Sequence, residues 1–442
     1  MAVVESPESA IANSERFKLW LRESTVPYVG SLIFTVMLAY YLNYLSGLAG
    51  MPSLIFKAQS PGIYVPFVGF PISLVLWFIC KAKPTSSVAA RIFLIGLAAA
   101  WIVHLALIRL HGDMSINSIW LYLPVLAMLY FKTPTQRDGW AALVFMAWVA
   151  AVLLVLTRVL EILDAIPMFN IPDKPATEWE KQHYWLPLSG HLGIDGRWPG
   201  PFGFNAKTGF FSVFIVIVGV ANWRRNSWLL VAIGGLGIVL TGGRGPYVAL
   251  LAGILVLILL GQRFGIQRIP MAVRLSLVVL GVAALAAKFA FFTSAGVTGR
   301  EEFWSAFLEL WRTSIWTGVG QEGIWNASGT VHAVMDAHSI YIQELTKYGL
   351  LGFIMLYGLL AFGLIISLIS AARGWAAPLA IIVVYLVSGF TDLLHDGWQA
   401  QSTYSLMIIV AVLAAAAWRP KDETTNASTD LEQGSDGLAL KS

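Results

Sequence analysis

Residues 139–160 read GWAALVFMAWVAAVLLVLTRVL, an apolar run long enough to cross a lipid bilayer as a single helix. Runs of this kind recur along the 442-residue chain, which is 57% hydrophobic and only 12% charged. Soluble domains are about a quarter charged, so a water-soluble core cannot absorb this composition. A segment inside a bilayer must also satisfy its backbone groups internally, which favours helices. We therefore expect an all-α integral membrane protein.

The apolar runs predict about twelve transmembrane helices by the usual window criterion. They cover residues 27–48, 62–80, 92–109, 116–131, 139–160, 207–222, 227–243, 245–261, 272–293, 340–370, 375–394 and 401–418. The run at 340–370 is longer than one crossing needs, so we expect its first turns to lie at the membrane surface.

The distribution of Lys and Arg predicts the orientation, because the cytoplasmic connections of membrane proteins collect positive charge. With both termini in the cytoplasm, 17 of the 29 Lys and Arg fall on inner segments and 12 on the outer side. Five of those 12 lie in two long extracytoplasmic loops, 161–206 and 294–339, where the charge rule has little force. The net charge of +4 then reflects orientation rather than nucleic-acid binding.

This orientation predicts one polytopic membrane domain, residues 27–418, between two polar ends. Residues 1–26 form a cytoplasmic N-terminal segment without the apolar stretch of a cleavable signal peptide. Residues 419–442 are rich in Asp, Glu, Ser and Thr, which predicts a disordered cytoplasmic tail. The single cysteine, Cys80, lies at a predicted inner span end, so an intramolecular disulfide is excluded.

The two long outer loops have different patterns. Loop 161–206 holds six prolines and three tryptophans, which favours a folded capping loop over a regular helix. In loop 294–339, apolar residues at 303, 304, 307, 308, 310 and 311 predict an amphipathic helix along the membrane interface. Gly318 and Gly320 end it. Long loops in a compact membrane protein are usually functional or disordered, and the aromatic content favours function.

His338 is the candidate catalytic residue of the second loop, where it stands just before an apolar run. An imidazole titrates near neutral pH and can take a proton from an attacking sugar hydroxyl. The alternative is a histidine that caps the helix. Asp336 can orient the ring or cap the same helix, Tyr341 shares its helical face, and His332 competes for its role.

Two arginines in Gly-rich settings are candidate phosphate ligands on the same side. Arg244 in Thr241-Gly242-Gly243-Arg244-Gly245 stands where a guanidinium is costly, and its fork matches phosphate oxygens. The alternative is an arginine that reaches to lipid headgroups. Arg197 lies in a loop of small and turn residues. It either binds a ligand there or is an ordinary solvated loop arginine. Lys207, at the start of the next predicted helix, is an alternative candidate for a phosphate contact, and Arg300 either anchors the interfacial helix or binds phosphate.

Several motifs that would indicate another chemistry are missing from the sequence. It contains no P-loop, no dinucleotide-binding fingerprint, no Gly-x-Ser-x-Gly element and no early Asp-x-Asp pair. Asp392, His395 and Asp396 form a small patch that can bind a divalent ion, but a solvated helix cap explains it better. We therefore expect neither a metal nor another cofactor.

In this order and spacing, the motifs resemble those of the O-antigen ligase and O-antigen polymerase family of bacterial membrane proteins. The resemblance covers roughly residues 190–370, with Ser339 and Gly243 departing from the residues common in the family. It rests on Gly196-Arg197 through Phe204-Asn205, on Thr241 to Gly245, on Gly299-Arg300 to Trp304, on Trp316-Thr317-Gly318-Val319-Gly320, on Ala337-His338-Ser339-Ile340-Tyr341 and on Tyr348-Gly349-Leu350-Leu351-Gly352.

The resemblance implies a membrane-embedded, GT-C-like glycosyltransferase at the outer face of the bacterial inner membrane. Such an enzyme moves a glycan from undecaprenyl diphosphate to a glycan or lipid A-core acceptor. By analogy, Arg197 and Arg244 bind the diphosphate and His338 is the base or positions the acceptor. A single base with in-line attack predicts inversion at the anomeric carbon, and fixed cations replace a metal.

Three other functions remain open at this point. A polymerase of the same family differs only in using a second lipid-linked glycan as acceptor. A secondary transporter or flippase would be expected to carry charged or broken spans and internal repeats, whereas these spans are almost free of charge. A scaffold protein within the membrane lipids would need no converging arginines.

Overall fold

The computed structural model describes residues 7–48, 65–83, 87–111, 119–163, 198, 200–202, 205–222, 226–261, 269–294, 300–328, 337, 339–391 and 403–418. All regular structure within these ranges is helical. The elements are α1 Pro7–Glu23, α2 Val26–Leu48, α3 Val65–Ile79, α4 Val88–Leu110, α5 Ile119–Phe131, α6 Gln136–Ile162, the 3-10 turn η3 Gly200–Phe202, α9 Asn205–Ala221, α10 Ser227–Thr241, α11 Arg244–Leu260, α12 Met271–Ser294, α13 Arg300–Arg312, α14 Gly320–Ser328, α15 Ile340–Ala372, α16 Ala377–Thr391 and α17 Thr403–Ala416.

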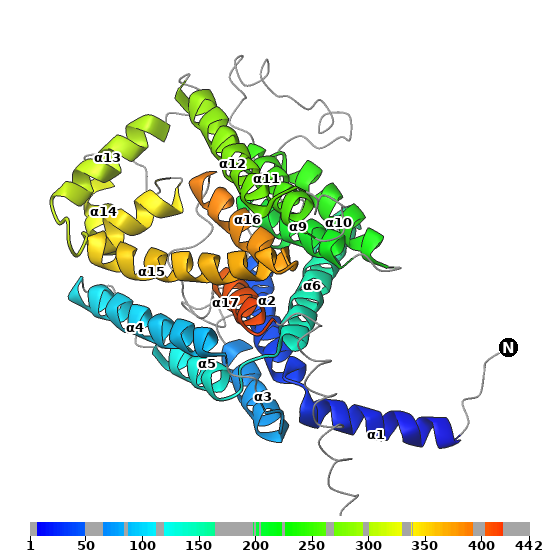
Figure 1. Cartoon of the computed structure of the whole chain (residues 1–442). Helices are drawn as coiled ribbons and strands as arrows, with labels where there is room; N and C mark the ends of the chain where they lie inside the picture. The colour runs from blue at the N-terminus through cyan, green and yellow to red at the C-terminus, as the bar shows by residue number, and fades with distance from the viewer. Residues whose placement is uncertain are drawn as a thin grey trace, which may run out of the picture.

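Each of the twelve predicted spans coincides with one of these helices (Figure 1). Within the described residues, three helices are long and apolar enough to cross a membrane by length and composition, namely α4, α6 and α15. Eight further helices contain shorter apolar stretches. An all-helical membrane protein is therefore consistent with the structure, and the number of twelve crossings stays a prediction.

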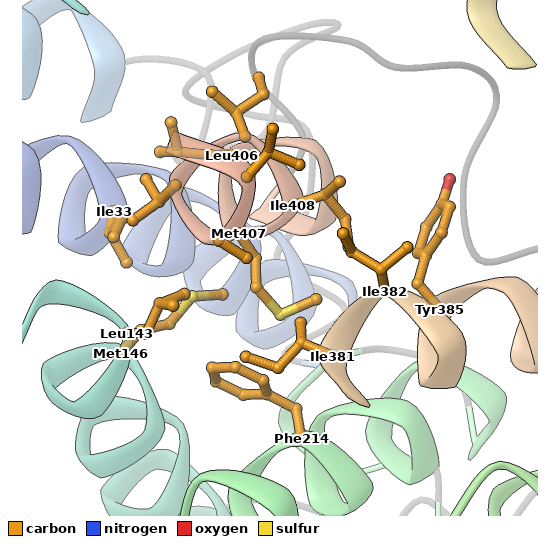
Figure 2. Close-up of a cluster of buried hydrophobic side chains, with 14 of the residues drawn as sticks. Ile33, Leu143, Met146, Phe214, Ile381, Ile382, Tyr385, Leu406, Met407 and Ile408 are labelled. Atoms are coloured by element: carbon orange, nitrogen blue, oxygen red, sulfur yellow. The ribbon is translucent and has the colours of Figure 1, made fainter. Parts of the chain in front are cut away.

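The core of the bundle is centred on α17, whose residues 405–415 are all buried. A helix that is apolar all round is stable only when neighbours cover every face. Helices α2, α4, α6, α15 and α16 supply that cover. Figure 2 shows Met407 of α17 among side chains from α2, α6, α9 and α16, with Phe214 and Ile381 beside it.

At the predicted inner end of the bundle, one carboxylate binds three polar groups of the segment before α2. Asp138, in the first turn of α6, accepts hydrogen bonds from the backbone N–H of Thr25 at 3.1 Å, from its hydroxyl at 2.8 Å and from the Ser24 hydroxyl at 3.2 Å. It thereby caps the start of α2. Cys80 is buried nearby, where its thiol donates to the Ser24 carbonyl.

The two predicted outer loops are described unequally. Residues 164–197, 199 and 203–204 of the first loop, and residues 392–400 with the Asp392, His395 and Asp396 patch, lie outside the described residues, as does the tail 419–442. In the second loop, the predicted amphipathic helix is confirmed as α13. Its apolar side includes Phe307, which packs with Ile324 of α14 and Ala337. Its position along the membrane interface stays a prediction.

The long run at 340–370 forms α15, but Gly349 interrupts it with φ 63° and ψ −169°. The first turns, up to Tyr348, are therefore a separate short helix. They are largely buried, because α13 and α14 pack against α15 there (Figure 1). The second outer loop thus folds over the turns that hydropathy alone assigns to the membrane surface.

Candidate functional site

The predicted site residues are described to different extents. Lys207 is half-buried in the first turn of α9, and Tyr341 lies in the first turn of α15. Arg244 and Arg300 are described only by their backbone, as the first residues of α11 and α13. The others, Arg197, His332, Asp336 and His338, lie outside the described residues. The convergence of their side chains stays a prediction, but several of their neighbours in the chain are described.

Trp198, the residue after Arg197, is tied to the end of α10. Its backbone N–H donates to the carbonyl of Leu240 at 3.2 Å, four residues before Arg244. Its indole is buried and its Nε1 donates to both carboxylate oxygens of Glu161, each at 2.9 Å. Trp198 is therefore fixed through both its backbone and its side chain, beside the element that precedes Arg244.

The two Gly-rich elements also touch through glycines that leave no room for a side chain. Gly200 has φ 58°, and a Cβ there would stand 2.5 Å from Thr208 Cγ2. A Cβ at Gly209 would stand 2.3 Å from Pro246 Cγ and 3.4 Å from the Thr241 hydroxyl. The start of α9 and the turn between α10 and α11 are therefore in direct contact.

Ala337, the residue before His338, is held at both its backbone groups. Its N–H donates to Gln343 Oε1 at 3.1 Å, and its carbonyl accepts from Trp304 Nε1 at 2.8 Å. On the other side of His338, Ser339 is extended, with φ −151° and ψ 121°, and begins α15. The chain is thus fixed immediately before and after position 338.

Helix α16 connects this segment with the two arginine elements. Tyr341 donates its hydroxyl to the carbonyl of Leu386 at 2.6 Å, and Ile340 packs against Gly389. On another side, α16 packs against α9 and α11, where Tyr385 meets Phe210 edge to face at 6.2 Å between ring centroids. The start of α15 and the α9–α11 pair therefore rest on one helix.

The remaining two motifs of the family pattern meet each other at the break in α15. The backbone N–H groups of Leu350 and Leu351 donate to the carbonyls of Ile315 and Trp316, at 2.8 and 3.0 Å. In return, the N–H of Val319 donates to the Thr346 carbonyl at 2.9 Å. At the break, backbone groups of α15 that lack a partner within the helix therefore form hydrogen bonds with the loop. Irregular backbone in a membrane protein needs such partners.

The sequence reasoning missed the polar residues that hold these segments. Glu161 is fully buried at the end of α6 and pairs with Arg158, with 3.0 Å between Nη1 and Oε2. Two charges at the end of an apolar span are a signal for function, so this pair was detectable. Gln343 gave no such signal, because it is an ordinary polar residue near a helix start.

These observations define the class as a helical membrane protein with polar, glycine-rich elements gathered at helix ends. Residues 229–357 match a family model described as O-antigen ligase. The match begins in α10 and ends in α15, and it supports an assignment to the O-antigen ligase family. This match agrees with the resemblance seen in the sequence over the residues that it covers. No curated protein matches the chain.

Proposed function

We propose that the protein is a glycosyltransferase that moves an oligo- or polysaccharide from undecaprenyl diphosphate to an acceptor glycan. The reaction takes place at the outer face of the bacterial inner membrane, with both termini in the cytoplasm. The family match supports the class of reaction. The observation that carries the proposal is the tie between Trp198 and Leu240, which joins the elements that bear Arg197 and Arg244.

The chemistry follows from the charge of the donor. When the sugar leaves the diphosphate, negative charge grows on the phosphate oxygens, and two guanidinium forks offset it. Arg197 and Arg244 have this role, with Lys207 as a supporting contact at the start of α9. This arrangement requires no metal ion, because the fixed cations supply the positive charge.

His338 acts as the general base in this proposal. It takes the proton from the acceptor hydroxyl while that oxygen attacks the anomeric carbon opposite the diphosphate, so the configuration inverts. The fixed backbone at Ala337 and Ser339 supports a defined position for the ring. Asp336, His332 and Arg300 are supporting candidates. Tyr341 has a structural contact, since its hydroxyl donates to α16.

The acceptor separates two versions of the proposal. A lipid A-core glycan makes the enzyme an O-antigen ligase, and a second lipid-linked glycan makes it a polymerase. The description of the matched family favours the ligase. A transporter or flippase is the remaining alternative, and it would release no free undecaprenyl diphosphate.

The direct test uses purified protein in lipid nanodiscs with a synthetic lipid-diphosphate donor and an acceptor glycan. We expect His338→Ala, Arg197→Ala and Arg244→Ala each to lower transfer by about a hundredfold or more. Arg312→Ala, which removes an exposed guanidinium at the end of α13, is the matched control and retains activity. Wild-type turnover in all three site variants contradicts the proposal.

Two measurements on the same preparation test the finer claims. Treatment with EDTA leaves the rate unchanged if the arginines alone stabilise the leaving group. NMR of the product shows an inverted anomeric configuration. Loss of activity that divalent ions restore contradicts the first claim, and retention of configuration contradicts the second.

A further inference from the structure

Glu161 is a buried carboxylate in the last turn of α6, a position that helix electrostatics disfavours. The carbonyl end of a helix carries partial negative charge, which repels an anion. Removing a carboxylate from water is strongly unfavourable unless partners satisfy it. Here the Trp198 indole and the Arg158 guanidinium surround it, at 2.9 and 3.0 Å. Because both the position and the burial of Glu161 are unfavourable, its presence there indicates a specific use.

That use is indicated by what Glu161 holds. The indole N–H lies 2.9 Å from each carboxylate oxygen, so the ring is fixed in one orientation by both of them. The Trp198 backbone is fixed separately through the Leu240 carbonyl. The chain then turns at once into the buried segment Gly200–Phe202, where Phe202 stacks on Phe211 at 4.0 Å between ring centroids. Two anchored points follow directly after position 197.

We propose that Glu161 and Trp198 are positioning residues for the donor diphosphate, acting through the Arg197 backbone. This inference rests on the proposed function. Glu161 holds the Trp198 indole, and the Leu240 carbonyl holds the Trp198 backbone beside the end of α10, four residues before Arg244. In this inference the two contacts act on Arg197 because it directly precedes Trp198 in the chain. Arg158 contacts the same carboxylate at 3.0 Å and offers it a charge-assisted hydrogen bond.

The test compares the KM for the donor with the KM for the acceptor and with kcat. Trp198→Phe keeps the aromatic volume and removes the N–H, and Glu161→Ala removes the acceptor. We expect each to raise the donor KM by about tenfold, the effect of losing one charge-assisted hydrogen bond, while the acceptor KM stays the same. Glu161→Gln retains one acceptor oxygen, so its donor KM lies between those of Glu161→Ala and the wild type.

The matched control is Trp140→Phe, the same change near the opposite end of α6, where Trp140 packs edge to face on Trp375. It leaves both KM values at the wild-type level. The double variant Glu161→Ala with Trp198→Phe resembles either single variant, because both break the same contact. If the donor KM of the double variant rises by the product of the two single effects, the inference is overturned.

The failures of the two proposals are distinguishable. If the wild-type protein transfers no glycan from the lipid diphosphate, the proposed function fails. If it does, and Arg197→Ala raises the donor KM while Glu161→Ala and Trp198→Phe leave it unchanged, only the positioning inference fails. Loss of folded protein in Trp198→Phe and Glu161→Gln alike, seen by size-exclusion chromatography, indicates a purely structural pair and also overturns it.

Discussion

Ala337 shows how single side chains fix the segment next to His338, the candidate catalytic residue. Neither Trp304 nor Gln343 was a candidate in the sequence, yet they hold the two backbone groups of the residue before His338. The candidates were found from residue type, since histidine and arginine carry chemistry wherever they stand. Trp304 and Gln343 lie 33 and 6 positions from Ala337 along the chain, and only the fold brings them into contact with it.

Replacement of Gln343 by Met leaves the buried Ala337 N–H without an acceptor. We expect Gln343→Met to lower the stability by about 1–3 kcal/mol, because a buried donor then loses its partner. The change keeps the length of the side chain, so packing is largely preserved. Thermal unfolding of the purified protein measures the effect, together with a fall in the transfer rate.

The control for this change is Leu345→Met, a volume-conserving substitution two positions further along the same helix. It costs less than about 1.5 kcal/mol. Equal stabilities of the Gln343→Met and wild-type proteins would show that the hydrogen bond to Ala337 is not needed.

At the scale of elements, hydropathy located every helix that it predicted, because apolar length alone determines which segments a bilayer can accept. It did not predict the interruption at Gly349, which depends on backbone angles to which hydropathy is blind. Gly318 and Gly349 face each other there: a Cβ on Gly318 would stand 2.3 Å from the Lys347 carbonyl oxygen. Two glycines far apart in sequence thus make one backbone-to-backbone junction.

Substitution at this junction is expected to be severe. In Gly349→Ala, the new Cβ would stand 2.4 Å from the backbone carbonyl of Trp316, and φ of 63° with ψ of −169° is open almost only to glycine. We expect a loss of at least about 2 kcal/mol and of activity. The apparent melting temperature in detergent measures the first.

Gly358 provides the comparison within α15. No heavy atom lies within 4 Å of a Cβ built there, so Gly358→Ala fits. It gains roughly 1 kcal/mol of helix propensity and raises or preserves the melting temperature. If Gly349→Ala kept the wild-type melting temperature, the break in α15 could form at another position along the helix.

For the whole molecule, the orientation is the main prediction that charge alone supplies. It can be tested because Cys80 is the sole cysteine and is buried. Cys80→Ser keeps a donor to Ser24 and yields a chain without thiols. Into it we place single cysteines at two exposed positions, Lys18 on α1 and Glu309 on α13.

A membrane-impermeant maleimide applied to spheroplasts is expected to label Glu309→Cys and to leave Lys18→Cys unlabelled. Breaking the membrane then exposes the second position to the reagent. The reverse pattern would place the α13 side in the cytoplasm and would remove the periplasmic site.

The central place of α17 has a consequence for how the protein is made. This helix is the last one described along the chain, yet α2, α4, α6, α15 and α16, all synthesised earlier, surround it. The ribosome therefore translates α2, α4, α6, α15 and α16 before the helix that they surround reaches the membrane. We therefore expect the contacts that cover α17 to form only after these helices have been inserted.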